Sequence, residues 1–417
     1  MLKRISTGLI CWFFFCGIAA AQDAHQKKPA EQLLISEIDQ VLQGKVDSNK
    51  IPGAVIEIKQ AGKIIYRQAY GSAQKYDYNH RELSSPEKMT IGHLFDIASL
   101  TKVIGTTTAI MLLVDKGLIH INDPVGKYIK AFNTGAKKAI TIRHLLTHTA
   151  GLYEWYPLYY KAANKEQTYR LIGELPLKYP VGQQRSYSDL GFVLLGEIIE
   201  IVSRLPLEQF EELNIFIPLG MTSTGYNPLK KERFKNIVAT SMGNPYERRM
   251  VYDSSLGFQV KGIDPASWNG WRQYVLRGEV NDGNAWYANG GISGAAGLFS
   301  TVEDLQKLVD VLVNNGKQGS RQFIEASTID SFLTPDKFKN GLGWMMDPEN
   351  SFMKNGPERS FGHTGFTGTS IAVIPKSNIS VILMINRQNM GLLSTGEYYN
   401  VNPIRQAVFQ SLLKFCD

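Results

Sequence analysis

The segment LFDIASLTKVIGTTTAIMLLV, residues 94–114, contains the pattern that decides the fold. An apolar run ends at a Ser-x-x-Lys motif formed by Ser99 and Lys102, and the spacing predicts a long apolar helix over residues 100–114. Side chains three positions apart lie on one face of a helical turn and can reach each other. An amine buried in such a helix loses its hydration and can help to deprotonate the hydroxyl. The alternative for Ser99 is an ordinary helix cap.

Ser-x-x-Lys alone is a weak signal, because the chain contains the pattern five times. The four other occurrences begin at Ser72, Ser85, Ser351 and Ser411. The first follows a predicted strand in a polar loop, the third lies in a polar stretch, and the fourth belongs to an amphipathic terminal helix. Ser85 precedes Pro86, a residue that suits the start of a helix, so we interpret Ser84 or Ser85 as a cap. Ser99 alone stands where a buried lysine partner is expected.

Two predicted hairpins at opposite ends of the chain indicate how the rest is organised. They comprise residues 54–59 and 64–69 around a turn at 60–63, and residues 369–374 and 379–386 around a turn at 375–378. Helical spacing is present at about 31–49 and 404–415. The sequence therefore predicts an α/β (α+β) fold, in which one antiparallel sheet is built from both chain ends and flanked by helices. The sheet is expected from about 51–98 and 355–417, with a mostly helical insertion at about 120–345.

The first 21 residues have the features of a secretion signal. Lys3 and Arg4 form a basic start, residues 9–18 are an apolar stretch that is short for a membrane span, and alanines at 19–21 fit a cleavage site. We expect the mature chain to be exported to the periplasm or secreted, with a lead-in helix at 22–50 before a domain at 51–417. An uncleaved signal would instead anchor the same domain to the inner membrane.

Composition excludes several classes of protein. The chain has 417 residues, of which 43% are hydrophobic and 20% charged, so it can bury a sizeable core and is not disordered. Its net charge of +7 is spread along the sequence without a basic cluster, which argues against nucleic acid as a partner. Signal cleavage would leave Cys416 as the single cysteine, so we expect no internal disulfide.

A metal or cofactor site is not expected. His144 and His148 have zinc-ligand spacing on a helix, but no third ligand stands out in the sequence. No cofactor signature is present either. In an exported protein of this kind, nucleophilic serine chemistry is therefore the first hypothesis to consider.

Two further motifs strengthen the hypothesis that Ser99 is a catalytic nucleophile. Tyr187 and Asp189, in a Tyr-Ser-Asp triplet, open a strongly apolar helix. A tyrosine beside a lysine could be held partly ionised and accept a proton. The triplet His363-Thr364-Gly365 introduces a strand that we expect to begin near Thr369. A small glycine on an edge strand would let a substrate backbone approach, and the strand could offer a backbone N–H.

With these three motifs in this order, the sequence resembles the serine β-lactamase and penicillin-binding superfamily, on the branch that contains class C β-lactamases, D-alanyl-D-alanine carboxypeptidases and related esterases. The resemblance covers about residues 50–390 and implies the β-lactamase/DD-peptidase fold. The supporting segments are HLLTHTAGL (144–152), YSDLGFVLLGEIIE (187–200), PLGM (218–221), DGNAWYANGGISGAAGLFSTVEDL (282–305), GLGW (341–344) and GHTGFTGT (362–369).

The resemblance implies roles for individual residues. Ser99 would be the acylated nucleophile, Lys102 its amine partner, and Tyr187 the proton shuttle for acylation and for attack of water on the acyl-enzyme. The motif at 363–365 would bind substrate. The backbone N–H groups of Ser99 and Phe366 would form the oxyanion hole.

The sequence departs from the family at two positions. Asp189 stands where the family usually has Asn, and an ionised Asp189 would favour a protonated Lys102 and shift the base role toward Tyr187. It would also remove an amide donor for the substrate. His363 replaces the more usual Lys and weakens a fixed positive charge for a substrate carboxylate. Both departures put efficient β-lactam hydrolysis in doubt and disturb ester or peptide hydrolysis less.

Two other features carry alternatives. Five aromatic residues either line a cleft over the nucleophile or pack a loop: Tyr153, Trp155, Tyr156, Tyr159 and Tyr160. Three more either shape the pocket or form an ordered loop: Asp282, Asn284 and Trp286.

The leading hypothesis is an exported serine hydrolase that forms an acyl-enzyme and acts as a DD-carboxypeptidase-type peptidase on peptidoglycan peptides. The alternatives are a carboxylesterase or a weak β-lactamase with the same residues. The alternative outside the enzymes is a protein that binds penicillin or muropeptides without turnover. The presence of Ser99, Lys102 and Tyr187 together argues against it, because a binding protein does not need all three.

Overall fold

The computed structural model describes residues 11–416, with side chains from residue 29 onward. Helix α1 (Cys11–Asp47) leads into the first strand and includes the helix expected at 31–49. Lys3 and Arg4 of the expected signal lie outside the described residues. Within the described chain, no helix is long and apolar enough to cross a membrane.

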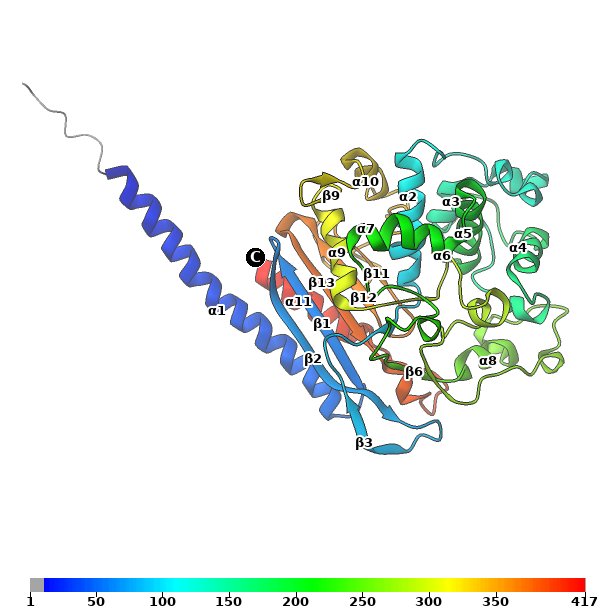
Figure 1. Cartoon of the computed structure of the whole chain (residues 1–417), viewed down its shortest axis with the longest axis horizontal. Coiled ribbons are helices and arrows are strands. Elements are labelled where there is room, and N and C mark those ends of the chain that lie inside the picture. The colour runs from blue at the N-terminus through cyan, green and yellow to red at the C-terminus, as the bar shows by residue number, and fades with distance from the viewer. Residues whose placement is uncertain (1–10, 417) are drawn as a thin grey trace, which may run out of the picture.

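A six-stranded antiparallel sheet forms the centre of the molecule, in the order β11-β12-β13-β1-β2-β3 (Figure 1). The strands are β1 (Gly53–Gln60), β2 (Lys63–Tyr76), β3 (Glu82–Lys88), β11 (Phe361–Thr364), β12 (Ser370–Ile374) and β13 (Ile379–Ile385). Strand β1, from the start of the domain, pairs with β13, near its end, from Ala54 opposite Ile385 to Gln60 opposite Ile379. The sheet is therefore built from both chain ends, which confirms the predicted fold class and both predicted hairpins.

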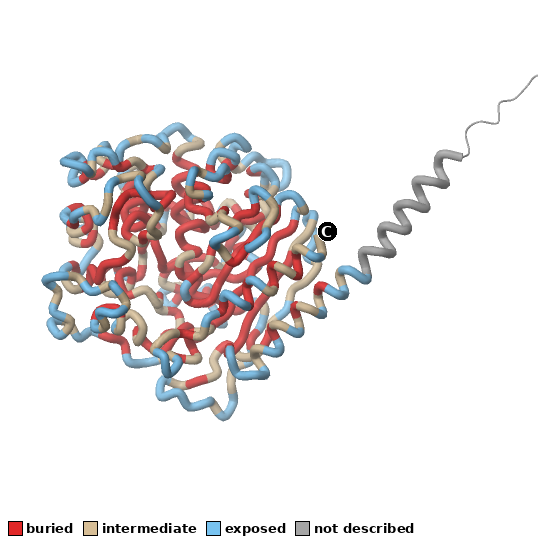
Figure 2. The backbone as a smooth tube through the Cα atoms, turned by 180° about the vertical axis from the view of Figure 1, so that it is seen from behind, coloured by how far each residue is buried: buried red, intermediate tan, exposed pale blue. Residues whose placement is uncertain are grey.

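Side-chain alternation along these strands divides the core into two layers. On one face, Ile56 and Leu383 pack with Leu34 and Ile38 of α1 and with α11 (Asn402–Cys416). On the other face, Val55 and other residues join a larger core with the central helices. Strands β1, β12 and β13 are accordingly buried on both sides, whereas β2 and the edge strand β3 are largely accessible (Figure 2).

The chain between the two halves of the sheet contains most of the helices, joined by long loops. Its helices are α2 (Thr108–Asp115), α3 (Ile142–Leu146), α4 (Lys165–Glu174), α5 (Asp189–Ser203), α6 (Leu207–Glu211), α7 (Ile217–Leu219), α8 (Pro245–Tyr252), α9 (Val302–Val313) and α10 (Ala326–Phe332). Three π-helical turns interrupt it: η1 (Lys102–Thr107), η6 (Glu212–Phe216) and η10 (Asn284–Ala288). The remaining strands form small sheets: β4 (Phe95–Asp96) with β8 (Leu298–Ser300) and β5 (Gly225–Tyr226), β6 (Ala239–Met242) with β7 (Val275–Arg277), and β9 (Lys317–Gln318) with β10 (Arg321–Gln322).

Three local predictions were wrong. The segment with Ser84 and Ser85 is edge strand β3 and not a helix start, and an edge strand tolerates Pro86 because the missing N–H is not needed for pairing. Ser72 lies within β2 and not in a loop after it. The strand expected near Thr369 is β12, but Gly365 does not lie on an edge strand as predicted, because edge strand β11 ends at Thr364 and Gly365 begins the turn into β12.

Candidate active site

Ser99 lies at the turn between the short strand β4 and the helix that contains η1. The turn is held by Asp96, whose Oδ1 accepts the N–H of Ala98 at 2.9 Å and whose Oδ2 accepts the N–H of Asn281 at 2.7 Å. Ala98 has a φ of 45°, in the left-handed region that costs a residue with a Cβ. Burial raises the pKa of Asp96 to about 6, although these two N–H bonds lower it. The residue before Ser99 is therefore held in a strained conformation by its neighbours.

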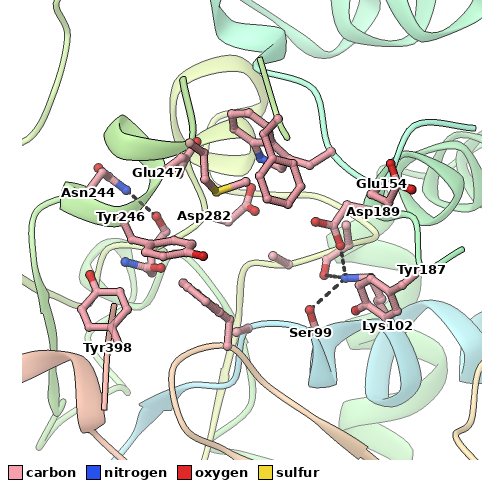
Figure 3. A pocket seen from close by; sticks show the side chains of 18 residues that line it. Ser99, Lys102, Glu154, Tyr187, Asp189, Asn244, Tyr246, Glu247, Asp282 and Tyr398 are labelled. Carbon is pink, nitrogen blue, oxygen red and sulfur yellow. Dashed lines mark hydrogen bonds and ion pairs between the residues drawn. The ribbon is translucent and has the colours of Figure 1, made fainter. Parts of the chain in front are cut away.

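Lys102 is fully buried one turn after Ser99. Its Nζ donates to Ser99 Oγ at 3.0 Å and to the carbonyl of Ala295 at 2.8 Å, and it forms an ion pair with Asp189 Oδ1 at 2.7 Å (Figure 3). The predicted Ser99–Lys102 contact is thus present. The ion pair brings together the two motifs that lie at residues 99–102 and 187–189.

Tyr187 completes this cluster from the loop before α5. Its side chain lies beside Ser99 and Lys102 in the same pocket, with Lys102 Nζ 5.2 Å from the centre of its ring (Figure 3). His148 supports the loop from behind, because its Nδ1 accepts the N–H of Ser188 at 3.0 Å and its ring lies 4.4 Å from the ring of Tyr187. The hydrogen bond to Ser188 and the contact between the two rings both fix the position of Tyr187.

The protonation states differ in part from the expectation. Burial alone would lower the pKa of Lys102, but the charge of Asp189 and the contact with Tyr187 outweigh it and raise this pKa above its ordinary value. Burial also raises the pKa of Tyr187, and the charge of Asp189 adds to this, although Lys102 and Ser99 oppose it. The prediction that the tyrosine is partly ionised was therefore wrong: the negative charge of the cluster lies on Asp189.

Asp189 is not the cap of helix α5. Ser188 is the N-cap, and its hydroxyl accepts the N–H of Gly191. Asp189 is the first helical residue, where its charge is favourable at the helix N-terminus, and its carboxylate points to Lys102.

His363 and Thr364 lie on edge strand β11 and Gly365 follows it, but of this segment only the next residue, Phe366, lines the pocket beside Ser99. His363 is buried, and its Nδ1 donates to the carbonyl of Thr364 at 2.9 Å. Burial, followed by the charge of Lys102, lowers the pKa of His363 to about 3. His363 is therefore neutral and supplies no positive charge for a substrate carboxylate.

Gly365 is needed for a reason other than the one predicted. It is buried, and a Cβ at this position would lie 2.1 Å from Thr369 Oγ1 and 2.5 Å from the carbonyl oxygen of Ile97. The missing side chain lets the turn after β11 approach the segment that precedes Ser99.

Two backbone N–H groups at the site are unused. In the described chain, no backbone or side-chain acceptor takes a hydrogen bond from the N–H of Ser99 or of Phe366. The two segments are joined by hydroxyls, since Thr367 Oγ1 donates to the Asp96 carbonyl at 2.7 Å and Thr369 Oγ1 to the Ile97 carbonyl at 3.1 Å. This arrangement can serve as an oxyanion hole.

Ser99, Lys102, Tyr187 and Asp189 lie at one end of a pocket of about 310 Å³. Figure 3 shows Asp282 and Glu247 further along its wall. The other lining residues are Ala98, Glu154, Trp155, Asn244, Tyr246, Met250, Phe258, Asn281, Ala295, Ala296, Phe366 and Tyr398. Among all lining residues there are four carboxyl groups and a single basic side chain, Lys102.

The two acids on the far wall hold protons more tightly than usual. Burial, then the charge of Asp189, raises the pKa of Asp282 to about 6. Burial, then the charge of Asp282, raises the pKa of Glu247 to about 8. Glu247 Oε2 accepts the N–H of Gly283 at 2.9 Å, which connects α8 to the loop after residue 281. No motif in the sequence indicated Glu247 as a pocket residue.

The two alternatives for the aromatic and polar loops are resolved residue by residue. Trp155 and Asp282 line the pocket. Tyr159 and Tyr160 pack against Trp268 at 4.7 and 5.6 Å between ring centroids, away from the lining. Asn284 is a structural link, because its side chain bridges the N–H of Leu158 and the carbonyl of Tyr156, and Trp286 packs on the guanidinium of Arg272.

His144 and His148 do not converge. His144 Nδ1 accepts the N–H of Thr141 at 3.1 Å in a capping box of α3, whereas His148 packs under Tyr187. Across residues 11–416, no group of three or more His, Cys, Asp or Glu side chains is placed to hold a metal ion.

The fold and the Ser-Lys-Tyr cluster together define a serine hydrolase of the β-lactamase fold. The chain belongs to the Beta-lactamase family, whose model matches residues 38–401. A protein of Escherichia coli O157:H7, provisionally named a D-alanyl-D-alanine carboxypeptidase, is 31% identical over 93% of this chain and 91% of its own. An N-acetylmuramyl-L-alanine amidase of Bacillus subtilis is 30% identical over 88% of this chain and 84% of its own.

A solved structure confirms the fold. A penicillin-binding protein homologue from Pyrococcus abyssi superposes with a TM-score of 0.66 over 91% of this chain and 77% of its own, at 22% sequence identity.

Proposed function

We propose that this chain is an exported serine hydrolase that forms an acyl-enzyme on Ser99 and cleaves peptidoglycan peptides as a DD-carboxypeptidase-type enzyme. The observation that carries the proposal is the cluster of Ser99, Lys102 and Tyr187 beside two unused N–H groups in one pocket. The names of the relatives from Escherichia coli and Bacillus subtilis support a peptidoglycan substrate.

The proton transfers follow from the charges in the cluster. Ser99 Oγ attacks the substrate carbonyl, and the new oxyanion accepts the N–H groups of Ser99 and Phe366. The Ser99 proton passes to the oxygen of Tyr187 while the Tyr187 proton passes to the leaving nitrogen, so the C–N bond breaks without a free tyrosinate. Water then attacks the ester through the same hydroxyl and releases Ser99. Lys102, cationic beside Asp189, donates to the Ser99 hydroxyl and orients it.

A second candidate is an ester or amide hydrolase whose substrate has no carboxylate beside the scissile bond. The charge of the pocket favours it, because the lining has three carboxyl groups besides Glu247, which its raised pKa of about 8 keeps largely protonated at neutral pH, against one basic side chain, and His363 is neutral. A carboxylate in the substrate would meet repulsion at this site, whereas an uncharged or cationic group would not.

One panel separates these candidates. We would compare kcat/KM for a p-nitrophenyl ester, nitrocefin, a D-Ala-D-Ala tripeptide and the same tripeptide with an amidated C-terminus, each with a Ser99→Ala control. Preference for the free carboxylate supports a carboxypeptidase. Preference for the amidated peptide or the ester supports the second candidate, and acylation without turnover on any substrate overturns both in favour of a binding protein.

Export is part of the same proposal and rests on residues 1–21. N-terminal sequencing of the protein from fractionated cells tests it. A mature chain that begins near residue 22 in the periplasmic or secreted fraction is expected, an intact N-terminus in the membrane fraction indicates an anchor, and an intact N-terminus in the cytoplasmic fraction contradicts export.

A further inference from the structure

Two arginines lie behind the loop that follows the 363–365 triplet. Arg405 of α11 is 7% exposed, and Arg387 follows β13. In the part of the chain that the structure describes, neither forms an ion pair with a carboxylate. Burial, followed by the charge of Arg387, lowers the pKa of Arg405 to about 9. A buried cation without a counter-ion is costly, so its hydrogen-bond partners indicate what holds it there.

Most of those partners are backbone carbonyls of one short loop; in addition, Arg405 Nη1 donates to Asn402 Oδ1 at 2.8 Å and Arg387 Nη1 to the carbonyl of Tyr399 at 3.1 Å. Arg405 Nη2 donates to the carbonyls of Gly365 at 3.0 Å and Thr369 at 2.8 Å. Arg387 Nε and Nη2 both donate to the carbonyl of Phe366, at 3.0 and 2.7 Å. Two guanidinium groups therefore hold the carbonyl oxygens on one side of residues 365–369.

The Gly365 carbonyl matters most, because it shares a peptide plane with the Phe366 N–H. In a trans peptide the C=O and the N–H point in opposite directions. A guanidinium that holds the carbonyl oxygen of Gly365 therefore aims the N–H of Phe366 away from Arg405. A positive charge on that oxygen also polarises the amide and strengthens its N–H as a donor.

The opposite side of the loop is the catalytic pocket. Phe366 lines it together with Ser99, and the N–H of Phe366 has no acceptor in the described chain. Thr367 and Thr369 fasten the loop to the carbonyls of Asp96 and Ile97, immediately before Ser99. The loop is thus fixed to the nucleophile segment on one side and to Arg405 on the other.

We propose that Arg405 is a positioning residue for the reaction: by binding the Gly365 carbonyl from behind, it orients and polarises the Phe366 N–H as the second donor of the oxyanion hole. The proposal rests on the proposed function, since it assigns Arg405 a role in stabilising the tetrahedral oxyanion formed on Ser99. Arg405 touches neither the substrate nor the reacting atoms.

The test combines kinetics with a transition-state analogue. In the mature protein, Arg405→Ala should lower kcat for the p-nitrophenyl ester by about 10- to 100-fold, somewhat less than the loss of a whole oxyanion-hole donor. KM should change little, because the oxyanion exists only in the transition state. A phenylboronic acid, which forms a tetrahedral adduct on the serine, should bind more weakly by a similar factor. Added guanidinium ion should restore part of the lost kcat and part of the lost boronate affinity.

Two variants keep the test decisive. Arg405→Lys retains a cation without the planar fork and should fall between wild type and Arg405→Ala; if the alanine variant does not fold, the lysine variant and its boronate affinity carry the test. Arg359→Ala removes a half-exposed arginine paired with Asp330 and should leave kcat and boronate binding unchanged.

The outcomes separate this inference from the proposed function. Unchanged kcat and boronate affinity in folded Arg405 variants, or a rise in KM alone, would overturn the role of Arg405. A wild-type protein that binds boronate but turns over none of the four substrates would overturn the proposed function, and the loss of boronate affinity in the variants would still measure the effect of Arg405.

Discussion

The ammonium group of Lys102 and the carboxylate of Asp189 form an ion pair at 2.7 Å, with Lys102 fully buried. The pair influences the chemistry beside it. It holds the lysine cationic, so the amine cannot accept the Ser99 proton in the resting state. Burial raises the pKa of Tyr187 against the opposing charge of Lys102, and the charge of Asp189 adds to the rise, so the phenol keeps its proton. The hydroxyl of Tyr187 is then the group through which protons must pass.

Replacing Tyr187 by Phe should therefore cut kcat severely, by roughly 10²–10⁴-fold as expected for a general acid–base group. The ring and its contacts with His148 are retained, so the fold should persist. Ester turnover measures the effect, with exposed Tyr78→Phe as the control. A loss below a few-fold would show that another group carries the proton.

Covalent labelling should occur at Ser99 alone. Lys102 Nζ donates to its hydroxyl, whereas Ser72 lies in strand β2 and Ser411 donates to Glu37. Exposure to a fluorophosphonate followed by peptide mass spectrometry should locate the adduct on the peptide that contains Ser99, and Ser99→Ala should abolish it. An adduct on any other serine would refute the assignment of the nucleophile.

Gly365→Ala should damage both stability and activity. The new Cβ would overlap Thr369 Oγ1 and the carbonyl of Ile97, so the loop and the nucleophile segment must separate. We expect a loss of about 1–3 kcal/mol in the free energy of unfolding, typical of overpacking. Urea unfolding measures it, and Gly44→Ala in α1, where a Cβ meets nothing within 4 Å, is the matched control. Equal stability of the two variants would contradict the steric argument.

Glu247→Gln should stabilise the protein in a pH-dependent way. Burial and Asp282 raise the pKa of Glu247 from 4.5 to about 8, so the folded protein keeps a proton that the unfolded chain releases. The wild type therefore loses stability as pH rises from about 4.5 to 8, and the loss levels off above that range. Because glutamine does not ionise, the stability gain of the variant should grow over the same window. Urea unfolding at about pH 5, 7 and 9 checks it; a gain independent of pH would refute it.

The sequence predicted the elements with strong local patterns and missed those that depend on tertiary contacts. The hairpins around 60–63 and 375–378 follow from side-chain alternation and turn residues, and the Ser99–Lys102 contact follows from helical spacing. Strand β3 was missed because Pro86 resembles a helix start when its pairing with β2 is unknown. No local pattern could assign the neutral state of His363, which depends on burial.

Arg405 was missed for a similar reason. It lies in a helix at the end of the chain, some 40 positions after the loop it holds, and no motif surrounds it. Asp96, by contrast, stands three positions before Ser99, and a buried acid before the nucleophile was a usable signal.

The Asp189→Asn variant tests the role of the aspartate that stands where the family usually has asparagine. Asparagine fits the first turn of α5, and the helix cap stays intact because Ser188 supplies it. The change removes the counter-ion of Lys102 and adds an amide donor that can face the substrate. Without the carboxylate, the pKa values of Lys102 and Tyr187 should both fall, because its charge raises each of them.

The alkaline limb of the kcat/KM profile should consequently move to lower pH in Asp189→Asn, since that limb reports the loss of a proton from the Lys102–Tyr187 cluster, which is active in its protonated form. The amide donor should also raise kcat/KM for nitrocefin and the D-Ala-D-Ala peptide relative to the p-nitrophenyl ester, because only the first two present an amide to it. Full pH profiles on the ester and the peptide measure both effects. An unshifted alkaline limb with an unchanged ester-to-amide ratio would mean that the Lys102–Asp189 pair only joins α5 to the helix after Ser99, and that the proton path through Tyr187 does not depend on the charge of the pair.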